Sequence, residues 1–305
     1  MSYAERDGIQ LHYDVTGPET GEPLLLIMGF TAQMTAWSDG FLQALAERGF
    51  RAIRFDNRDC GLSSKTEGPP PLAPALLMRA QAGEDISAEV PYTLTDMARD
   101  ALTVLDHLGI DRAHIVGASM GGMIAQELAI HFPERVRSLT SIMSSTGDTE
   151  VGGAKPGVME AMMTPAPEDR DAVIARSMDI GRMVAGPLWD EGEALARAQA
   201  AYDRSFHPIG AVFQIAAIAA SGNRTEKLRS VSVPTLVIHG RADPLIEMSG
   251  GVATAAAIPG ADLLILGHMG HNLPPLYWDQ VADSIASLAR RSALPLPVLA
   301  EAAAE

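Results

Sequence analysis

The sequence predicts an α/β fold in which helices cover both faces of a mostly parallel, doubly wound sheet. Two observations support this prediction. Short apolar runs typical of buried strands alternate along the chain with stretches of helical period. The alternation stops at residues 146–224, which hold helical runs, several prolines and five methionines but no strand pattern. We therefore expect a core domain at residues 1–145 and 225–292, an inserted helical lid at 146–224, and a frayed tail at 293–305.

The strands expected in the first part of the chain are short and mostly apolar. Residues 9–15 alternate between apolar and polar side chains, which is the period of a strand with one solvated face. Residues 24–28 are apolar throughout, as in a central strand that is covered on both faces. Two further apolar runs fit strands at residues 50–56 and 113–116. The proline-rich residues 68–91, by contrast, have no clear period.

The expected helices lie between these strands and near the end of the chain. Thr93 and Asp96 fit a capping box at the start of a helix whose apolar face continues to Leu108. The same patterns predict further helices at residues 41–46, 122–130 and 279–290. They predict further strands at residues 138–143, 234–238 and 262–266. Ligands of such sheets bind at the carboxyl ends of the strands, so we look for the site there.

Composition excludes several classes of partner. The 305 residues are 47% hydrophobic, enough for a sizeable core, and the net charge of −15 without any block of Lys or Arg argues against nucleic acid. Cys60 is the only cysteine, so no intrachain disulfide can form. The first residues lack the apolar segment of a signal peptide, and the longest apolar runs are far short of the ~20 residues that span a bilayer. We expect a cytoplasmic protein without a membrane partner.

The stretch Gly-Ala-Ser-Met-Gly at residues 117–121 is the strongest motif of the chain. It lies between the strand expected at 113–116 and the helix expected at 122–130. In that context Gly-x-Ser-x-Gly is a nucleophile elbow, a turn so tight that Ser119 is strained and its neighbours must be glycine. The following helix directs its N-terminus at the same place, which favours developing negative charge there.

A serine hydroxyl becomes an effective nucleophile when a histidine accepts its proton and a carboxylate orients that histidine. After an elbow the acid and then the histidine are expected downstream, each behind a strand. Asp243 follows the strand at 234–238, and this order favours it over the rival acid Asp148. Two histidines, His268 and His271, follow the last strand. They lack the accompanying cysteines or carboxylates of a metal site.

Five stretches together resemble the α/β-hydrolase superfamily over nearly the whole chain, and in particular small bacterial serine esterases of the branch that includes aclacinomycin methylesterase. They are Ile-Met-Gly-Phe at 27–30, Arg-Phe-Asp-Asn-Arg-Asp at 54–59, the elbow at 117–121, His-Gly-Arg-Ala-Asp at 239–243 and Met-Gly-His at 269–271. The resemblance implies that Ser119 is the nucleophile, Asp243 the acid and His271 the general base. It selects His271 over His268 because Asn-Leu-Pro follows Met-Gly-His, as in the family.

The same resemblance implies an oxyanion hole made of the backbone N–H groups of Phe30 and Met120. The sequence departs from a common form of the family at Met28, where many members carry histidine before the glycine. Because the donor is a backbone N–H group, the change bears on loop geometry more than on activity. Asp56 and Arg58 resemble residues that brace the loops, and we interpret them as structural.

The predicted function is hydrolysis of carboxylic esters through an acyl-enzyme, without cofactor or metal. The expected partner is a small apolar ester. A lactonase, a carbon–carbon bond hydrolase or a cofactor-free perhydrolase would use the same triad, and a non-catalytic ligand-binding member is the alternative from another class.

Two further interpretations concern single residue types. His114 lies in the middle of a strand and is expected to be an ordinary core or surface side chain. The five methionines of the lid, at positions 159, 162, 163, 178 and 183, are expected in the core more than at a substrate. A deformable, Met-rich lid nevertheless suits an apolar and bulky acyl or alcohol group.

Overall fold

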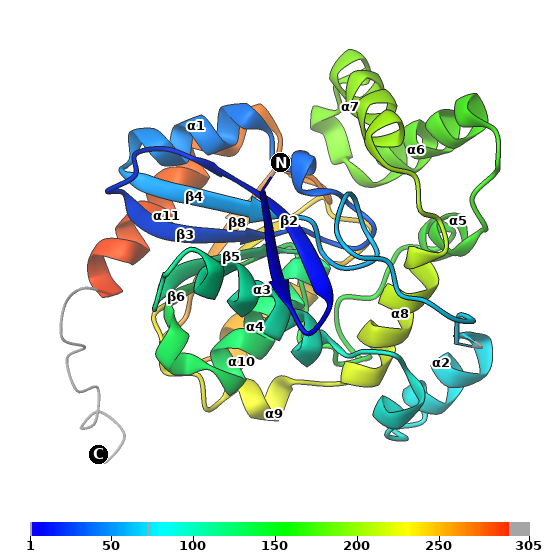
Figure 1. Ribbon diagram of the computed structural model, residues 1–305, viewed down its shortest axis with the longest axis horizontal. Coiled ribbons are helices and arrows are strands. Elements are labelled where there is room, and N and C mark those ends of the chain that lie inside the picture. The colour runs from blue at the N-terminus through cyan, green and yellow to red at the C-terminus, as the bar shows by residue number, and fades with distance from the viewer. Residues whose placement is uncertain (1, 72, 293–305) are drawn as a thin grey trace.

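The computed structural model describes residues 2–71 and 73–292, so the tail predicted at 293–305 lies outside the described residues. Within these described residues, eight strands form one sheet in the order β1-β2-β4-β3-β5-β6-β7-β8 (Figure 1). The strand bounds are β1 Ser2–Arg6, β2 Ile9–Thr16, β3 Glu22–Ile27, β4 Phe50–Phe55, β5 Ala113–Ala118, β6 Val136–Ile142, β7 Thr235–Gly240 and β8 Asp262–Leu266. Among the described strands, β2 pairs antiparallel with β1 and β4, and all other neighbours pair in parallel. The mostly parallel α/β fold is therefore confirmed.

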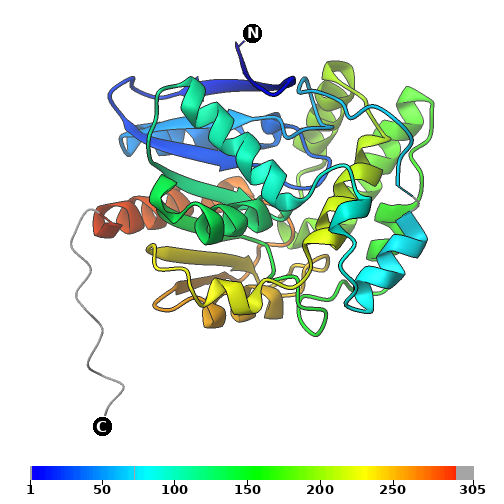
Figure 2. The same ribbon diagram turned by 60° about the horizontal axis from the view of Figure 1, so that its bottom comes forward.

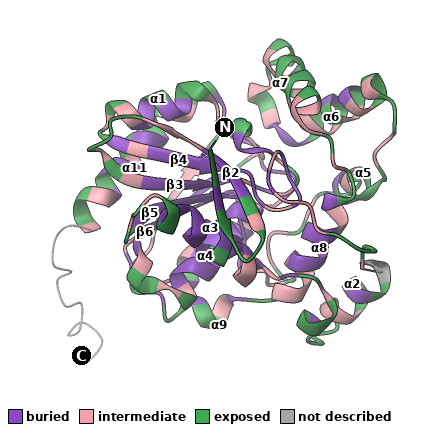
Figure 3. Ribbon diagram, viewed as in Figure 1, coloured by how far each residue is buried: buried purple, intermediate pink, exposed green. Residues whose placement is uncertain are grey.

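Helices cover both faces of the sheet (Figure 2). On one face lie α1 (Asp39–Glu47) and α11 (Trp278–Ser292), and on the other lie α3 (Leu94–His107), α4 (Met120–His131) and α10 (Ser249–Ala257). Successive residues of a strand face opposite layers, so Leu24 and Leu26 pack with α1 and α11 whereas Leu25 and Ile27 pack with α3 and α4. Figure 3 shows the resulting buried layers on both sides of the sheet. The uniformly apolar pattern of this strand follows from its two-sided burial.

The strand order reverses between β3 and β5. From β3 the chain continues to β4 on one side, and from β5 it continues through β6 and β7 to β8 on the other. Crossover connections diverge at such a point and leave a crevice at the carboxyl ends of the two strands. Residue 28 follows β3 and residue 119 follows β5, so both loops begin in that crevice.

The chain between β6 and β7 is helical, and we call residues 146–224 the inserted segment. Its helices are α5 (Val158–Met163), α6 (Arg170–Val184), α7 (Glu191–Arg204) and α8 (Gly210–Ser221), and it contains no strand. They gather on one side of the sheet in Figure 1. Of the five methionines, only Met178 is fully buried and Met162 is partly buried. The expectation of core methionines is wrong for the other three, at positions 159, 163 and 183, which are exposed on the helix surfaces.

Several elements carry no periodic signal and were not expected. They are β1, α2 (Ala73–Gln81), α9 (Thr225–Leu228), α10 and the short 3₁₀ helices Met34–Ala36, Ser87–Glu89, Pro133–Arg135, Gly186–Leu188 and Pro275–Tyr277. The capping box at Thr93 is confirmed, since its side chain accepts the Asp96 N–H and the Asp96 carboxylate accepts the Thr93 N–H. Within residues 2–71 and 73–292, none of the helices combines the length and the apolar character that a bilayer crossing needs. The cytoplasmic location stays a prediction.

Candidate active site

Ser119 lies on the turn between β5 and α4 with strained backbone geometry. Its φ of 56° and ψ of −122° fall in a backbone region that residues other than glycine rarely adopt. The flanking glycines are required by contact: a Cβ on Gly117 would lie 2.0 Å from the Gly121 carbonyl oxygen, and one on Gly121 would lie 2.0 Å from the Ile27 carbonyl oxygen. The turn is thus pressed against its own helix and against the end of β3.

The structure brings Ser119, His271 and Asp243 together at the carboxyl ends of β5, β8 and β7. His271 Nε2 is 2.9 Å from Ser119 Oγ, and His271 Nδ1 is 2.7 Å from Asp243 Oδ2. The buried Asp243 carboxylate also accepts the N–H groups of Leu245 and Ile246 at 2.9 and 3.0 Å through Oδ1. Because a carboxylate only accepts, the Nδ1 of His271 carries the proton and Nε2 is left to accept the serine hydroxyl.

The rival residues lie elsewhere. His268 has an exposed side chain, and its backbone N–H donates to the Tyr277 hydroxyl at 3.1 Å. The Asp148 carboxylate accepts the Glu150 N–H at 3.0 Å within its own turn. Neither residue has a hydrogen bond to Ser119 or His271 in the described part of the chain.

The two backbone N–H groups of the predicted oxyanion hole adjoin Ser119. Met120 is the first residue of α4, and a Cβ on Gly29 would lie 3.0 Å from the Ser119 Cβ. Among the described residues neither Phe30 N–H nor Met120 N–H has a hydrogen-bond partner. The Met28 carbonyl accepts the Asn57 side-chain amide at 2.8 Å, so the backbone of the loop is anchored here without a histidine at position 28.

Buried polar side chains brace the loops around this centre. Asp56 is fully buried and accepts the backbone N–H groups of Met34 and Leu62 and the guanidinium of Arg204. Arg58 binds the Asp100 carboxylate through two hydrogen bonds of 2.5 and 2.6 Å. These contacts agree with the structural role expected for Asp56 and Arg58.

His239 is a neighbour of the acid that the sequence reasoning missed. It is fully buried, its Nε2 is 2.8 Å from the Ile246 carbonyl and 3.6 Å from Asp243 Oδ2, and its burial lowers its pKa. The neutral ring therefore donates to Ile246 and holds the loop that carries Asp243. Its only sequence signal is its place at the end of a strand before Gly240. His114, in contrast, is a satisfied core side chain, 2.8 Å from Ser138 Oγ.

The inserted segment meets the histidine and aspartate loops directly. The His271 N–H donates to the Val184 carbonyl at 2.6 Å, just beyond the triad side chains. Val158 and Val184 form an apolar cluster with Leu245, next to the acid, and Met162, Ile180 and Ile246 pack against it. One flank of the site is therefore apolar and is supplied by both the inserted segment and the core.

Comparison with known proteins places the chain in a family. Residues 22–275 match the family model described as alpha/beta hydrolase fold. The chain therefore belongs to the alpha/beta hydrolase fold family, as a hydrolase. Among its relatives, rhodomycin D methylesterase DauP of Streptomyces sp. (strain C5) is 27% identical, over 93% of this chain and 96% of that protein.

Other similar proteins carry different activities. The 2-hydroxy-6-oxononadienedioate/2-hydroxy-6-oxononatrienedioate hydrolase of Burkholderia vietnamiensis is 28% identical, over 87% of this chain and 86% of that protein. Among solved structures, the meta-cleavage product hydrolase CumD of Pseudomonas fluorescens has a TM-score of 0.75 at 20% identity, covering 96% of this chain and 98% of that one. The last similarity concerns the fold alone.

Proposed function

We propose that this protein is a serine hydrolase that cleaves carboxylic esters through an acyl-enzyme. The observation that carries the proposal is the relay of two hydrogen bonds, 2.9 Å from His271 to Ser119 and 2.7 Å from His271 to Asp243, on an elbow whose serine is strained. This geometry is the one in which imidazole accepts the serine proton as Oγ attacks a carbonyl carbon.

Each step of the proposed reaction uses a group already described. Ser119 Oγ bonds to the ester carbonyl carbon while its proton moves to His271 Nε2. The resulting oxyanion accepts the N–H groups of Phe30 and Met120, which have no other partner among the described residues. His271 then gives the proton to the departing alkoxide, and an acyl-Ser119 ester and an alcohol result. Water repeats the sequence, releasing the acid and restoring Ser119.

The proposed substrate is a small apolar ester. The apolar cluster beside Asp243, built from Val158, Val184 and Leu245, supports an apolar group on that flank. The printed names of relatives support ester chemistry, since DauP and a second Streptomyces relative are methylesterases. The identity of 27% supports the class of reaction and not the acyl or alcohol group.

The test is a burst assay with p-nitrophenyl acetate, butyrate and octanoate, with and without a fluorophosphonate, followed by intact mass. We expect turnover, a single phosphonyl adduct and its absence in Ser119→Ala. Hydrolysis by Ser119→Ala should fall by several orders of magnitude, because loss of the nucleophile removes the whole covalent route. Ser284→Ala is the matched control, because Ser284 is a half-buried serine of α11 that donates to the Gln280 carbonyl, and it should label and hydrolyse normally.

The outcomes separate the alternatives. A clean adduct without ester turnover would mean an activated serine with another substrate, and lactones and carbon–carbon substrates would then be tested. Neither adduct nor turnover would favour a non-catalytic ligand-binding member. Undiminished hydrolysis in Ser119→Ala would contradict the mechanism.

A further inference from the structure

Thr31 follows the oxyanion donor Phe30 and has an unusual backbone. Its φ is 57°, a left-handed value that a β-branched residue adopts only where its surroundings enforce it. The Ala32 N–H donates to the Gly29 carbonyl at 3.3 Å, so residues 29–32 form a turn with Thr31 third. Glycine or asparagine is usual where the third residue of a turn has positive φ. Something other than local preference therefore holds Thr31.

The contact that holds the Thr31 N–H comes from the inserted segment. Gln214, on α8, is completely buried, and its Oε1 accepts the Thr31 N–H at 2.8 Å. Its Nε2 donates to the Arg58 carbonyl at 2.9 Å. Both bonds fix which end of the amide faces which loop, because Thr31 offers a donor and Arg58 an acceptor. The Gln214 side chain therefore links α8 to both the turn at residues 29–32, which we call the oxyanion loop, and the loop after β4.

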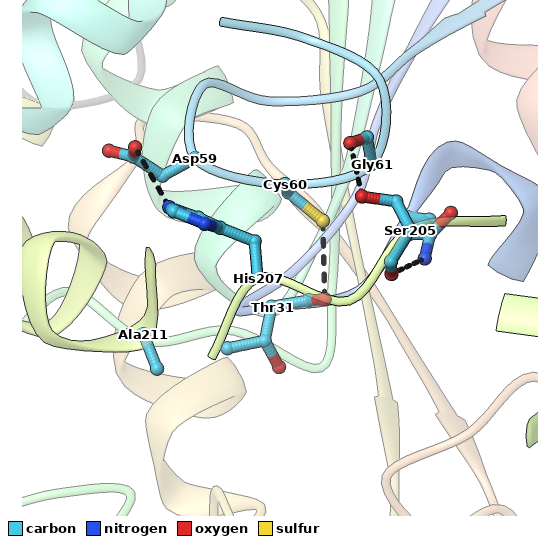
Figure 4. Close-up of a pocket in the computed structure, with 8 residues that line it drawn as sticks. Thr31, Asp59, Cys60, Gly61, Ser205, His207 and Ala211 are labelled. Atoms are coloured by element: carbon cyan, nitrogen blue, oxygen red, sulfur yellow. Dashed lines mark hydrogen bonds and ion pairs between the residues drawn. The ribbon is translucent and has the colours of Figure 1, made fainter. Parts of the chain in front are cut away.

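Thr31 is an exposed residue that borders open space. Thr31 lines a small cavity of about 40 Å³ together with Asp59, Cys60 and His207 (Figure 4). The Thr31 carbonyl accepts the Cys60 thiol at 3.2 Å, as the dashed line in Figure 4 shows. With open space on one side of the residue, its strained conformation depends on its N–H and carbonyl partners.

The start of α8 is docked tightly enough to act as a fixed support. A Cβ on Gly210 would lie 2.2 Å from the Asp59 carbonyl oxygen, so this helix and the loop after β4 are in backbone contact. Ser205 Oγ, in the short connection from α7 to α8, donates to the Gly61 carbonyl at 2.6 Å. Gln214 therefore extends from a helix whose position relative to that loop is already set.

We propose that Gln214 is a positioning residue for the oxyanion hole. By binding the Thr31 N–H it keeps the turn at residues 29–32 in the conformation that presents the Phe30 N–H beside Ser119. The inserted segment then contributes to rate as well as to substrate fit. The inference rests on the proposed function, since it assigns the Phe30 N–H to the transition state.

The test compares Gln214→Met with a matched variant of the same helix. Methionine keeps the length and apolar stem but leaves both the Thr31 N–H and the Arg58 carbonyl without their side-chain partner. Ser221→Ala is the control, because Ser221 Oγ likewise accepts a core backbone N–H, that of Leu94 at 3.0 Å, far along the chain from the oxyanion loop. Each variant loses one accepted and one donated hydrogen bond. Because Gln214 is completely buried and Ser221 is half-buried, thermal denaturation should show the larger cost in Gln214→Met, and activity is compared at a temperature where both variants are folded.

Measurements of kcat and KM distinguish a positioning role of Gln214 from a purely structural one. We expect Gln214→Met to lower kcat by about 10-fold or more with KM nearly unchanged, short of the roughly 10²- to 10³-fold cost of removing a whole oxyanion donor. Its affinity for an alkyl boronic acid, whose tetrahedral adduct places an oxygen in the hole, should fall in parallel. Ser221→Ala should keep both values. Equal kcat in the two variants, or a change in KM alone, would overturn the inference.

A rescue and a rate-independent measurement complete the design. Glycine adopts positive φ without strain, so Thr31→Gly should recover part of the kcat lost in Gln214→Met. Hydrogen exchange of peptides spanning residues 28–34 should rise in Gln214→Met and stay at the wild-type level in Ser221→Ala. Unchanged exchange rejects the inference even if the protein has no esterase activity. Absence of labelling and turnover in the wild type rejects the proposed function instead.

If Gln214→Met does not fold, Gln214→Glu replaces it, since one carboxylate oxygen still accepts the Thr31 N–H. We then expect lower stability with most of kcat retained. A loss of kcat as large as that predicted for methionine would count against a positioning role.

Discussion

At the scale of single residues, the elbow depends on two glycines that have no room for a methyl group. The ideal Cβ of Gly117 would lie 2.0 Å from the Gly121 oxygen and 2.7 Å from the Gly122 nitrogen, all rigid backbone. We expect Gly117→Ala to displace the turn, lower the free energy of unfolding by several kcal/mol and abolish labelling of Ser119. Urea denaturation and intact mass after fluorophosphonate treatment measure both effects.

Gly192 offers the control for that substitution. It lies in α7 with its nearest neighbour 3.6 Å from the ideal Cβ position. Alanine has the higher helix propensity, so Gly192→Ala should be neutral or slightly stabilising, by at most about 1 kcal/mol. A Gly117→Ala protein that labels as fast as Gly192→Ala would show that the elbow can relax, contrary to the contact geometry.

The Cys60 thiol gives a second prediction at this scale. The thiol is buried, and the burial raises its pKa to about 12. The reactive thiolate is therefore scarce at pH 8, and we expect iodoacetamide to leave the folded protein unmodified while the urea-unfolded chain gains one adduct. Mass spectrometry over time distinguishes the two. Rapid alkylation of the folded protein would mean that the loop carrying Cys60 opens.

Some residues of the candidate site can be predicted from the sequence and others cannot. Ser119, Asp243 and His271 were predicted because each follows a strand and because the motifs around them are local. Gln214 was missed because it is one amide in a mostly apolar helix, and the Thr31 N–H that it binds lies 183 positions away. His239 was missed because a histidine at a strand end has no signal that separates packing from chemistry.

At the scale of elements, one ion pair attaches α7 to the core. Arg204 Nη2 is 2.7 Å from Asp56 Oδ2, and Arg204 Nη1 donates to Gln33 Oε1 at 2.5 Å. Asp56 is completely buried, so Arg204→Met would leave its carboxylate with backbone N–H donors but no cation. We expect a loss of about 3 kcal/mol in the free energy of unfolding, near the lower end for broken buried pairs.

The matched control is another arginine of α7, Arg197. Arg197 pairs with Glu193 at 2.5 Å in an exposed i,i+4 arrangement, and Arg197→Met should cost less than about 0.5 kcal/mol. Urea denaturation gives both values, and limited proteolysis should cleave residues 146–224 faster in Arg204→Met only. Equal stability of the two variants would mean that Asp56 is satisfied by its backbone donors.

Elements with periodic apolar faces were predicted, and elements built from small residues were not. The helix α3 has a strong apolar stripe and a capping box, so its position was readable. In α10 the sequence Ser-Gly-Gly-Val-Ala-Thr-Ala-Ala-Ala carries no such stripe. Its glycines allow close contact instead, because a Cβ on Gly251 would lie 2.4 Å from His239 Nδ1. The strand β1 buries only Ala4, which leaves no alternation to detect.

At the scale of the whole molecule, the sheet explains why the location of the candidate site was predictable from sequence, whereas the contacts of the inserted segment were not. Strand order is fixed by short crossovers between apolar runs, and it brings the ends of β3, β5, β7 and β8 to one edge. The contacts of the inserted segment are single polar side chains, such as Gln214 and Arg204, whose partners depend on tertiary placement. Composition and periodicity do not encode those pairings.

Buried histidines make the stability of the whole molecule depend on pH. His114, near the start of β5, and His239, near the end of β7, are both buried, and burial is the largest cause that lowers the pKa of each below the ordinary 6.5. For His114 the Glu22 carboxylate opposes this shift without reversing it. The unfolded chain therefore binds protons that the folded protein does not as the pH falls below 6.5.

The sign of the effect follows from that difference. A histidine whose pKa is lower in the folded protein does not reduce stability while the pH is above the pKa of the unfolded chain. Its contribution is lost as the pH falls from that pKa to the pKa of the folded protein. The free energy of unfolding should therefore decline below pH 6.5, with a slope approaching about 1.4 kcal/mol per pH unit for each histidine that stays neutral. Urea denaturation from pH 8 to pH 5 measures this slope. His114→Gln removes one of the two histidines, so it should reduce the slope by up to about 1.4 kcal/mol per pH unit. Near pH 8 the difference in the free energy of unfolding between the two proteins should not change with pH. An identical slope in both proteins would show that His114 binds its proton equally well in the folded state, and that its burial is offset by Glu22.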